Sequence, residues 1–228
     1  MVCAVLASAI WSSGQPATAE QAPDTMAARV LACATCHGPV GQGSSNDSFP
    51  RLSGKPAGYL YNQLVAFRDG RRRYAPMNYL LAYLPNPTLQ AIADFYAAER
   101  PAMAEPSIPI VSAELLAAGQ ALAAHGDPAR GVPACSTCHG PAFSGMEPGI
   151  PGLVGLRPSY ISAQLGAWRY GIRTAAAPDC MQIVAGHLTE TDVTAVAAWL
   201  ATLPGVAGAA PAPAGSNPMP LACGSEPR

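Results

Sequence analysis

The chain has 228 residues, of which 50% are hydrophobic, 7% aromatic and 12% charged, and its formal net charge is −1. This balance gives no basis for nucleic-acid binding, because a phosphate-binding surface needs a clear excess of Lys and Arg. The 22 glycines and 24 prolines predict short helices joined by long ordered loops. Small domains of this kind have thin side-chain cores, which a large flat apolar cofactor would complete.

The amino-terminal segment has features of an export signal. Residues 2–11 form a short apolar run, and Ala17-Thr18-Ala19 fits a small-residue cleavage site. The run is too short to span a bilayer, and it lacks Lys or Arg near Met1. We expect residues 1–19 to be a signal peptide and the mature protein to be exported to the periplasm.

A helix is expected to lead into the first of two related motifs. Asp24 is its expected N-cap, and the helix runs into Cys-Ala-Thr-Cys-His at residues 33–37. A second motif, Cys-Ser-Thr-Cys-His, occupies residues 135–139. The pattern C-x-x-C-H is typical of haem attachment, since two thiols one helical turn apart reach both vinyl groups of a porphyrin. The adjacent histidine then lies under the iron.

The motifs therefore predict two haem c groups. The residues expected to attach them and to bind their irons are Cys33, Cys36 and His37 in the first motif and Cys135, Cys138 and His139 in the second.

Paired C-x-x-C motifs have two other interpretations. Four thiols could form one zinc centre, but the spacing is far longer than usual and the histidines would be unexplained. A thioredoxin-like redox motif needs a strand before it and a helix after it, which neither copy shows.

Helical periodicity continues beyond the first motif. Leu60, Leu64 and Phe67 lie on one helical face and predict a helix that ends at Gly70. Asn86 is expected as the N-cap of the next helix, with proline in the first helical position.

Three prolines in residues 101–109 predict an interdomain linker, and Ser112 is expected to cap the following helix. The predicted domains are 20–105 and 106–206, followed by a Pro-rich tail over 207–228.

The second half of the chain repeats the first. Cys33 and Cys135 are 102 residues apart. Ten further positions match at an offset of 101, namely Pro50, Leu52, Gly54, Tyr59, Gln63, Leu64, Phe67, Arg68, Gly70 and Arg72 with Pro151, Leu153, Gly155, Tyr160, Gln164, Leu165, Trp168, Arg169, Gly171 and Arg173. The chain is a tandem duplication, and each half is expected to wrap about three helices around one haem.

Each iron needs a second axial ligand. Met77 lies 40 residues after His37 and Met181 lies 42 after His139, each in a Pro-containing loop. A thioether opposite histidine raises the potential of the iron, which suits an electron carrier. Both methionines are therefore expected as axial ligands.

Arginines gather just before Met77. Arg72 is the candidate for a haem propionate contact because Arg173 repeats it. Arg68, Arg71 and Arg73 are either a solvated helix end or a docking surface for an acidic partner.

Several stretches together resemble the cytochrome c4 family, in which two class I cytochrome c domains are fused in tandem. They are CATCHG and CSTCHG, FPRLSG and IPGLVG, YLYNQLVAFRDGRR and YISAQLGAWRYGIR, and the two methionines. The resemblance covers about residues 24–205. It implies an all-α periplasmic di-haem carrier with His/Met ligation and no catalytic residues. Such proteins shuttle electrons between redox partners such as a membrane dehydrogenase and a terminal oxidase, and associate with membranes through those partners.

Two departures from the family keep other functions open. Cys180 stands directly before Met181, and the long tail carries Cys223. We expect these thiols to pair in an oxidising compartment. If Cys180 instead bound iron, the protein would be an enzyme similar to thiosulfate dehydrogenases. Di-haem peroxidases and the cytochrome subunit of a larger dehydrogenase are further alternatives.

Overall fold

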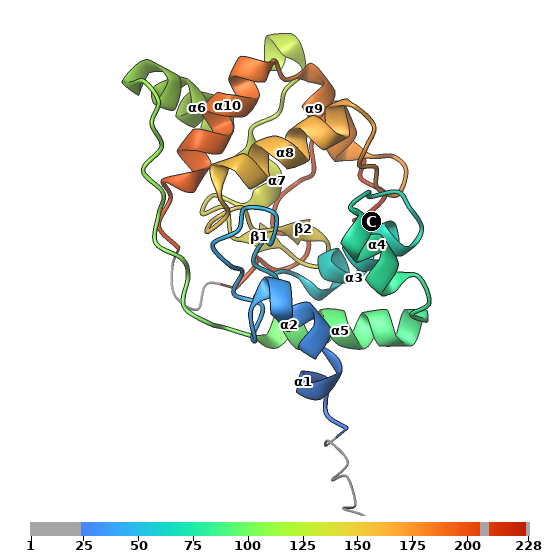
Figure 1. Cartoon of the computed structure of the whole chain (residues 1–228). Coiled ribbons are helices and arrows are strands. Elements are labelled where there is room, and N and C mark those ends of the chain that lie inside the picture. Colours follow the sequence, from blue (N-terminus) through green and yellow to red (C-terminus); the bar gives the residue numbers. More distant parts are fainter. Residues whose placement is uncertain (1–23, 206–209, 227–228) are drawn as a thin grey trace, which may run out of the picture.

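The computed structural model describes residues 24–205 and 210–226. The expected signal peptide, residues 1–19, lies outside these ranges. The regular secondary structure of the described chain is helical apart from one two-stranded hairpin, which confirms the expected all-α class (Figure 1). None of the described helices is both long and apolar enough to cross a bilayer.

The first half of the chain carries five helices. They are α1 (Met26–Arg29), α2 (Leu31–His37), α3 (Ala57–Arg68), α4 (Ala75–Leu81) and α5 (Asn86–Ala98). The expected helices around Leu60 and after Pro85 are α3 and α5. Helix α4 was not expected, because its proline in the first turn reads as a loop signal although it also suits a helix start.

The second half carries the equivalent elements and a hairpin. They are α6 (Ala113–His125), the 3-10 turn η1 (Pro128–Arg130), α7 (Cys135–His139), β1 (Gly145–Met146), β2 (Ile150–Pro151), α8 (Pro158–Arg169), α9 (Cys180–His187) and α10 (Glu190–Ala201). Strands β1 and β2 pair antiparallel. Residues 99–112, between α5 and α6, contain no helix or strand.

Two predicted helix starts were wrong by one residue. Thr25 caps α1, because its hydroxyl accepts from the amide of Ala28, while Asp24 instead pairs with Arg29. Asn86 is the first residue of α5 and Pro85 its N-cap. The prediction for Ser112 is confirmed, since its hydroxyl accepts from the Leu115 amide.

The helix into the first motif is also broken, at Val30, so that α1 and α2 are separate. Val30 is almost completely buried in the core of the first half, against Leu60 and Ile92. The chain therefore changes direction where this side chain enters the core.

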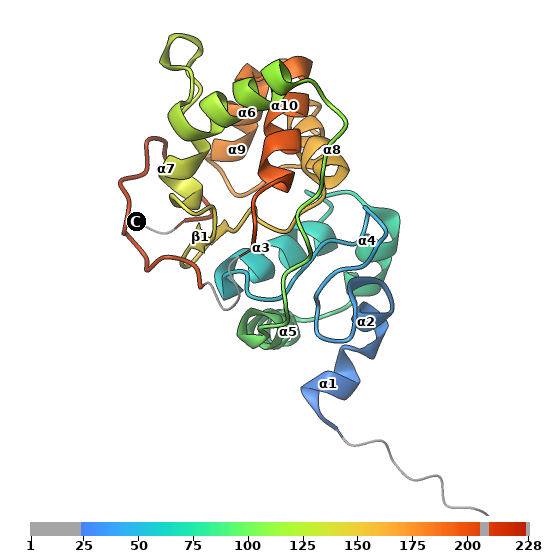
Figure 2. The same ribbon diagram turned by 90° about the vertical axis from the view of Figure 1, so that its left-hand side faces the viewer.

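Each half has its own core. In the first half α3 packs on α5, and in the second half α10 packs on both α6 and α8. Gly119 permits the close approach of α6 to α10, because a Cβ at this position would collide with the Ala195 carbonyl. Both views show the two halves as separate layers joined along one side by the extended linker (Figure 2).

The C-terminal tail runs back toward the junction of the two halves. Ala212 exchanges backbone hydrogen bonds with Gly145 and Glu147 beside the hairpin. Further on, the Gly224 amide donates to the Pro178 carbonyl, and Asn62 of α3 donates to the Ser225 carbonyl at 3.3 Å. The tail therefore contacts both halves.

Candidate functional site

The two motif histidines have the same environment. His37 and His139 end α2 and α7, and each is 7% exposed. Nδ1 of His37 lies 2.8 Å from the Pro50 carbonyl, and Nδ1 of His139 lies 2.7 Å from that of Pro151. Because a carbonyl only accepts, Nδ1 carries the proton and Nε2 is free for a metal.

Burial lowers the pKa of both histidines and so favours the neutral ring. Neutral imidazole with its second nitrogen held by a backbone carbonyl is the state that ligates iron.

The motif cysteines are not disulfide-bonded. Burial raises the pKa of Cys33 and Cys138, and raises that of Cys135 to about 11. Across the described ranges no group of three or more His, Cys, Asp or Glu side chains is arranged to hold a metal ion. The four-sulfur zinc centre is therefore not formed, and the buried thiols suit thioether bonds to an apolar cofactor better than thiolate coordination.

One complete set of the expected haem residues lines a cavity in the second half. Cys135, Cys138, His139 and Met181 all line it. Its apolar wall is formed by Leu122, Val132, Leu153, Leu156, Ile161, Leu165, Trp168, Val184, Leu188, Val196 and Leu200. A flat apolar ring with an iron at its centre fits this donor set and this wall.

The two methionines lie in the first turns of α4 and α9 rather than in loops. Met181 packs against the core of the second half, together with Cys135. Met77 packs beside Phe67 and Leu81 in the first half. The two short helices thus place the methionines at equivalent positions of the repeat.

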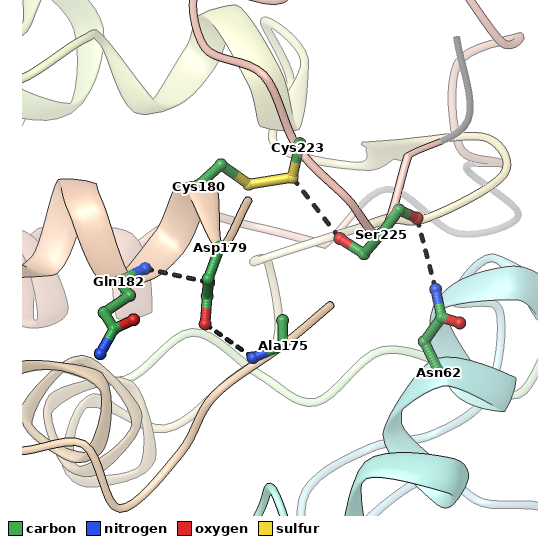
Figure 3. The surroundings of a disulfide bond; sticks show 7 residues. All are labelled: Asn62, Ala175, Asp179, Cys180, Gln182, Cys223 and Ser225. Atoms are coloured by element: carbon green, nitrogen blue, oxygen red, sulfur yellow. Dashed lines mark hydrogen bonds between the residues drawn. A yellow bond between two sulfur atoms is a disulfide. The ribbon is translucent and has the colours of Figure 1, made fainter. Parts of the chain in front are cut away.

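The structure joins Cys180 and Cys223 by a disulfide, the pair that the sequence suggested (Figure 3). Cys180 begins α9, directly before Met181, and Asp179 caps the helix by accepting from the Gln182 amide at 3.1 Å. The disulfide therefore fastens the tail to the helix that carries Met181.

The tail also forms part of the cavity wall. Met219, Leu221 and Ser225 line it together with Cys223. The tail thus covers a side of the second-half cavity, a role that the sequence did not indicate because the first half has no equivalent segment.

A cluster of cations lies where the halves meet. Arg72 and Arg173 are 9% and 3% exposed. Arg72 donates to the Tyr160 hydroxyl at 2.9 Å and to Gln164 at 2.8 Å, and Arg173 donates to Gln63 at 2.7 Å. Each arginine is therefore held by side chains from the opposite half.

No carboxylate balances these charges. None of the six ion pairs found in the described part of the chain includes Arg72, Arg173 or Lys55. Trp168 lies against Arg173, whose guanidinium carbon is 3.7 Å from the ring centroid. The buried indole nitrogen of Trp168 has no hydrogen-bond partner among the described residues. Buried cations beside an unsatisfied donor fit the carboxylates of a haem propionate pair.

The cluster could be only partly predicted. Arg72 and Arg173 were expected from the repeat. The repeat also contains the two tyrosines and two glutamines at the same offset, but it assigns no contacts to them. Their contacts across the junction depend on how the halves are arranged, which the sequence does not indicate.

The basic run near Met77 is divided between two environments. Arg68 lies 2.9 Å from Asp69 and Arg71 lies 3.7 Å from it, whereas Arg73 is exposed. Tyr79, in α4, is 81% exposed, and Tyr83, which follows α4, is 94% exposed. Basic and aromatic side chains therefore share the surface around the helix of Met77.

Comparisons with known proteins agree with this geometry. A cytochrome c family model matches residues 25–104. The thiosulfate dehydrogenase electron acceptor of Thiomonas intermedia is 36% identical over 90% of this chain and 90% of its own. Cytochrome c4 of Pseudomonas aeruginosa is 33% identical over 86% of this chain and 96% of its own.

Solved structures show the same architecture. Reduced cytochrome c4 from Pseudomonas stutzeri superposes with a TM-score of 0.68 at 28% identity, covering 78% of this chain and 96% of that one. The thiosulfate dehydrogenase TsdBA from Marichromatium purpuratum superposes with a TM-score of 0.67 at 38% identity, covering 75% of this chain but 36% of that longer one. With two tandem cytochrome c domains and a haem c motif in each, this chain belongs to the cytochrome c4 family of di-haem electron-transfer proteins.

Proposed function

We propose that this protein is the periplasmic electron acceptor of a thiosulfate-oxidising dehydrogenase and passes the electrons on to a respiratory acceptor. The observation that carries the proposal is the 36% identity, over nine-tenths of both chains, to a relative named for that role. A second relative so named, from Stutzerimonas stutzeri, is 37% identical over 76% of this chain. Oxidation of thiosulfate releases electrons, and each haem iron accepts one.

The same proposal assigns the cofactor ligands. Cys33 and Cys36 would attach haem 1, and His37 and Met77 would bind its iron. Cys135 and Cys138 would attach haem 2, and His139 and Met181 would bind its iron, behind an apolar wall that excludes water. A fixed imidazole and a thioether suit electron transfer, because the iron could change its charge without a change of ligands.

The carrier function is favoured over the enzyme alternative by the position of Cys180. An enzyme with a cysteine-ligated haem needs a free thiolate near the iron, whereas Cys180 is bonded to Cys223. With methionine on the sixth position, neither iron would have a site for substrate. The protein therefore depends on a separate dehydrogenase.

The surface around α4 is the proposed docking site for that dehydrogenase. Arg71 and Arg73 add positive charge beside the exposed rings of Tyr79 and Tyr83, and Met77 lies in the same helix. Aromatic and arginine side chains are enriched where protein surfaces bind. A partner with an acidic rim around an apolar centre would dock beside the helix that carries Met77.

The proposal is tested by mixing the two-haem protein with thiosulfate and a purified thiosulfate dehydrogenase. We expect the haem absorption to change to that of the reduced form only when the dehydrogenase is present. Arg71→Gln with Arg73→Gln should weaken the salt dependence of the rate, whereas Arg29→Gln, at an exposed site away from α4, should not. Reduction by thiosulfate without the dehydrogenase would instead support the enzyme alternative.

A further inference from the structure

Lys55 is the single lysine of the chain. It breaks the repeat, because the offset of 101 that relates Tyr59 to Tyr160 relates Lys55 to Leu156. A charged side chain thus stands in the first half where the second half has an apolar one.

Lys55 belongs to the first half of the chain, but its ammonium contacts the second half. Nζ donates to the Gly152 carbonyl at 2.8 Å. Gly152 directly follows Pro151, whose carbonyl accepts the hydrogen bond from His139 Nδ1. Lys55 also lines the cavity that contains Cys135, Cys138 and Met181.

No carboxylate pairs with this ammonium in the part of the chain that the structure describes. None of the ion pairs in the described chain includes Lys55. Burial lowers the pKa of Lys55 to about 8. The nearby Tyr59 hydroxyl opposes this shift, whereas Arg51, Arg173 and Arg72 add to it. Arg72 and Arg173 are the candidates for the propionate contacts, so Lys55 is not needed for them. Its positive charge would instead change the electrostatic potential in the cavity.

We propose that the charge of Lys55, a residue of the first domain, raises the reduction potential of haem 2 relative to that of haem 1. Reduction adds one electron and removes one unit of positive charge from the iron. A fixed cation nearby therefore favours the reduced form, and the effect falls with distance. Lys55 has no counterpart that could act on haem 1, since Leu156 is uncharged. The resulting difference in potential would direct electrons from haem 1 to haem 2.

This inference rests on the proposed binding of haem 2, but not on thiosulfate as the source of electrons. The test is a spectroelectrochemical titration of the two-haem protein without any partner, after mass spectrometry has shown two attached haems. Lys55→Leu copies the residue of the second half. Lys55→Gln removes the charge but keeps a donor for Gly152, and Lys55→Arg keeps the charge.

We expect Lys55→Leu and Lys55→Gln to lower the potential of haem 2 more than that of haem 1, and Lys55→Arg to preserve the difference. The matched control Arg29→Gln removes one positive charge from the same half at an exposed site and should leave the difference unchanged. In a Met181→His background, which moves the haem 2 step to lower potential, Lys55→Leu should spare the remaining high-potential step.

Three results would overturn the inference. The first is an unchanged difference in potential when Lys55→Leu retains both haems. The second is an equal shift of both haems. The third is a Lys55→Gln protein that behaves as the wild type, because the hydrogen bond to Gly152 and not the charge would then matter. Failure of the thiosulfate assay would leave this titration unaffected.

Discussion

Arg72 and Arg173 lie opposite each other in an antiparallel backbone bridge, so the halves are joined at positions that the repeat makes equivalent. The Thr174 amide donates to the Arg71 carbonyl at 2.7 Å beside this bridge. Each guanidinium then reaches glutamines of both halves, since Arg72 also bonds Gln63 and Arg173 also bonds Gln164. At the junction, equivalent residues of the two halves thus surround two buried arginines that no described carboxylate neutralises.

The first prediction concerns this pair. Arg72→Gln and Arg173→Gln should each destabilise the protein by about 1–3 kcal/mol, because each substitution leaves tyrosine or glutamine acceptors of the opposite half without their donor. The double variant should cost less than the sum, since both arginines share Gln63 and Gln164. Denaturant unfolding of the two-haem protein measures this, with the exposed Arg157→Gln as the control. Fully additive losses would show that the arginines act separately.

The second prediction concerns covalent attachment. Protein matured in a periplasm should have the mass of the chain plus two haems. Cys36→Ala with Cys33→Ala should remove one haem, and Cys138→Ala with Cys135→Ala should remove the other, because each pair forms its own thioether bonds. Mass spectrometry distinguishes these outcomes. Retention of both haems after either double substitution would contradict the assignment.

The third prediction concerns the methionines. Ferric haem with a methionine ligand has a weak near-infrared charge-transfer band, and Met77→His or Met181→His should each remove about half of it and lower one potential. Met103→Leu is the control, because this methionine contacts glycines outside the haem cavity. A variant with unchanged band and potentials would exclude that methionine as a ligand.

The fourth prediction concerns the tail. The Cys180–Cys223 disulfide closes a separation of 43 residues, so Cys223→Ser should destabilise the protein by about 4 kcal/mol on the chain-entropy model. It should also free α9 and increase loss of the Met181 ligand, seen as a smaller near-infrared band from haem 2 alone. Alkylation of the unreduced, denatured wild type should label neither cysteine, and labelling of both would contradict the pairing.

The fifth prediction concerns acid stability. Arg130 and the capping box with Thr189 lower the pKa of Asp192 to about 2. The folded pKa is depressed, so this stabilisation is present above the unfolded value of 3.8 and is lost as the pH falls toward 2. Asp192→Asn should lower the free energy of unfolding by about 1 kcal/mol at neutral pH, and by almost nothing near pH 2. Thermal unfolding over this range measures it, with exposed Asp94→Asn as the control.

Much of the fold could be predicted, because it depends on local sequence. The motif positions, helices α3, α5 and α6 and the tandem duplication all follow from spacing and periodicity. Helices α4 and α9 could not be predicted, since each begins beside proline or in a loop-like stretch and is held by tertiary packing of its methionine. The break at Val30 likewise depends on the core that this residue enters.

The sequence indicated the residues that line the second-half cavity, but not the contacts that form where the halves meet. Cys135, Cys138, His139 and Met181 line one cavity of the second half. Lys55 enters the same cavity from the first half, and its place there depends on the packing of two domains. Trp168 was noted only as a match to Phe67, because its unsatisfied nitrogen is a property of the folded protein.

The most direct test is a stoichiometric titration of the oxidised two-haem protein with thiosulfate in the presence of a catalytic amount of thiosulfate dehydrogenase. Each haem iron takes one electron, so reduction should be complete at two electrons per chain, with haem 2 reduced before haem 1. A protein that chemical reductants reduce fully, but that stays oxidised in this mixture, would contradict the proposed function.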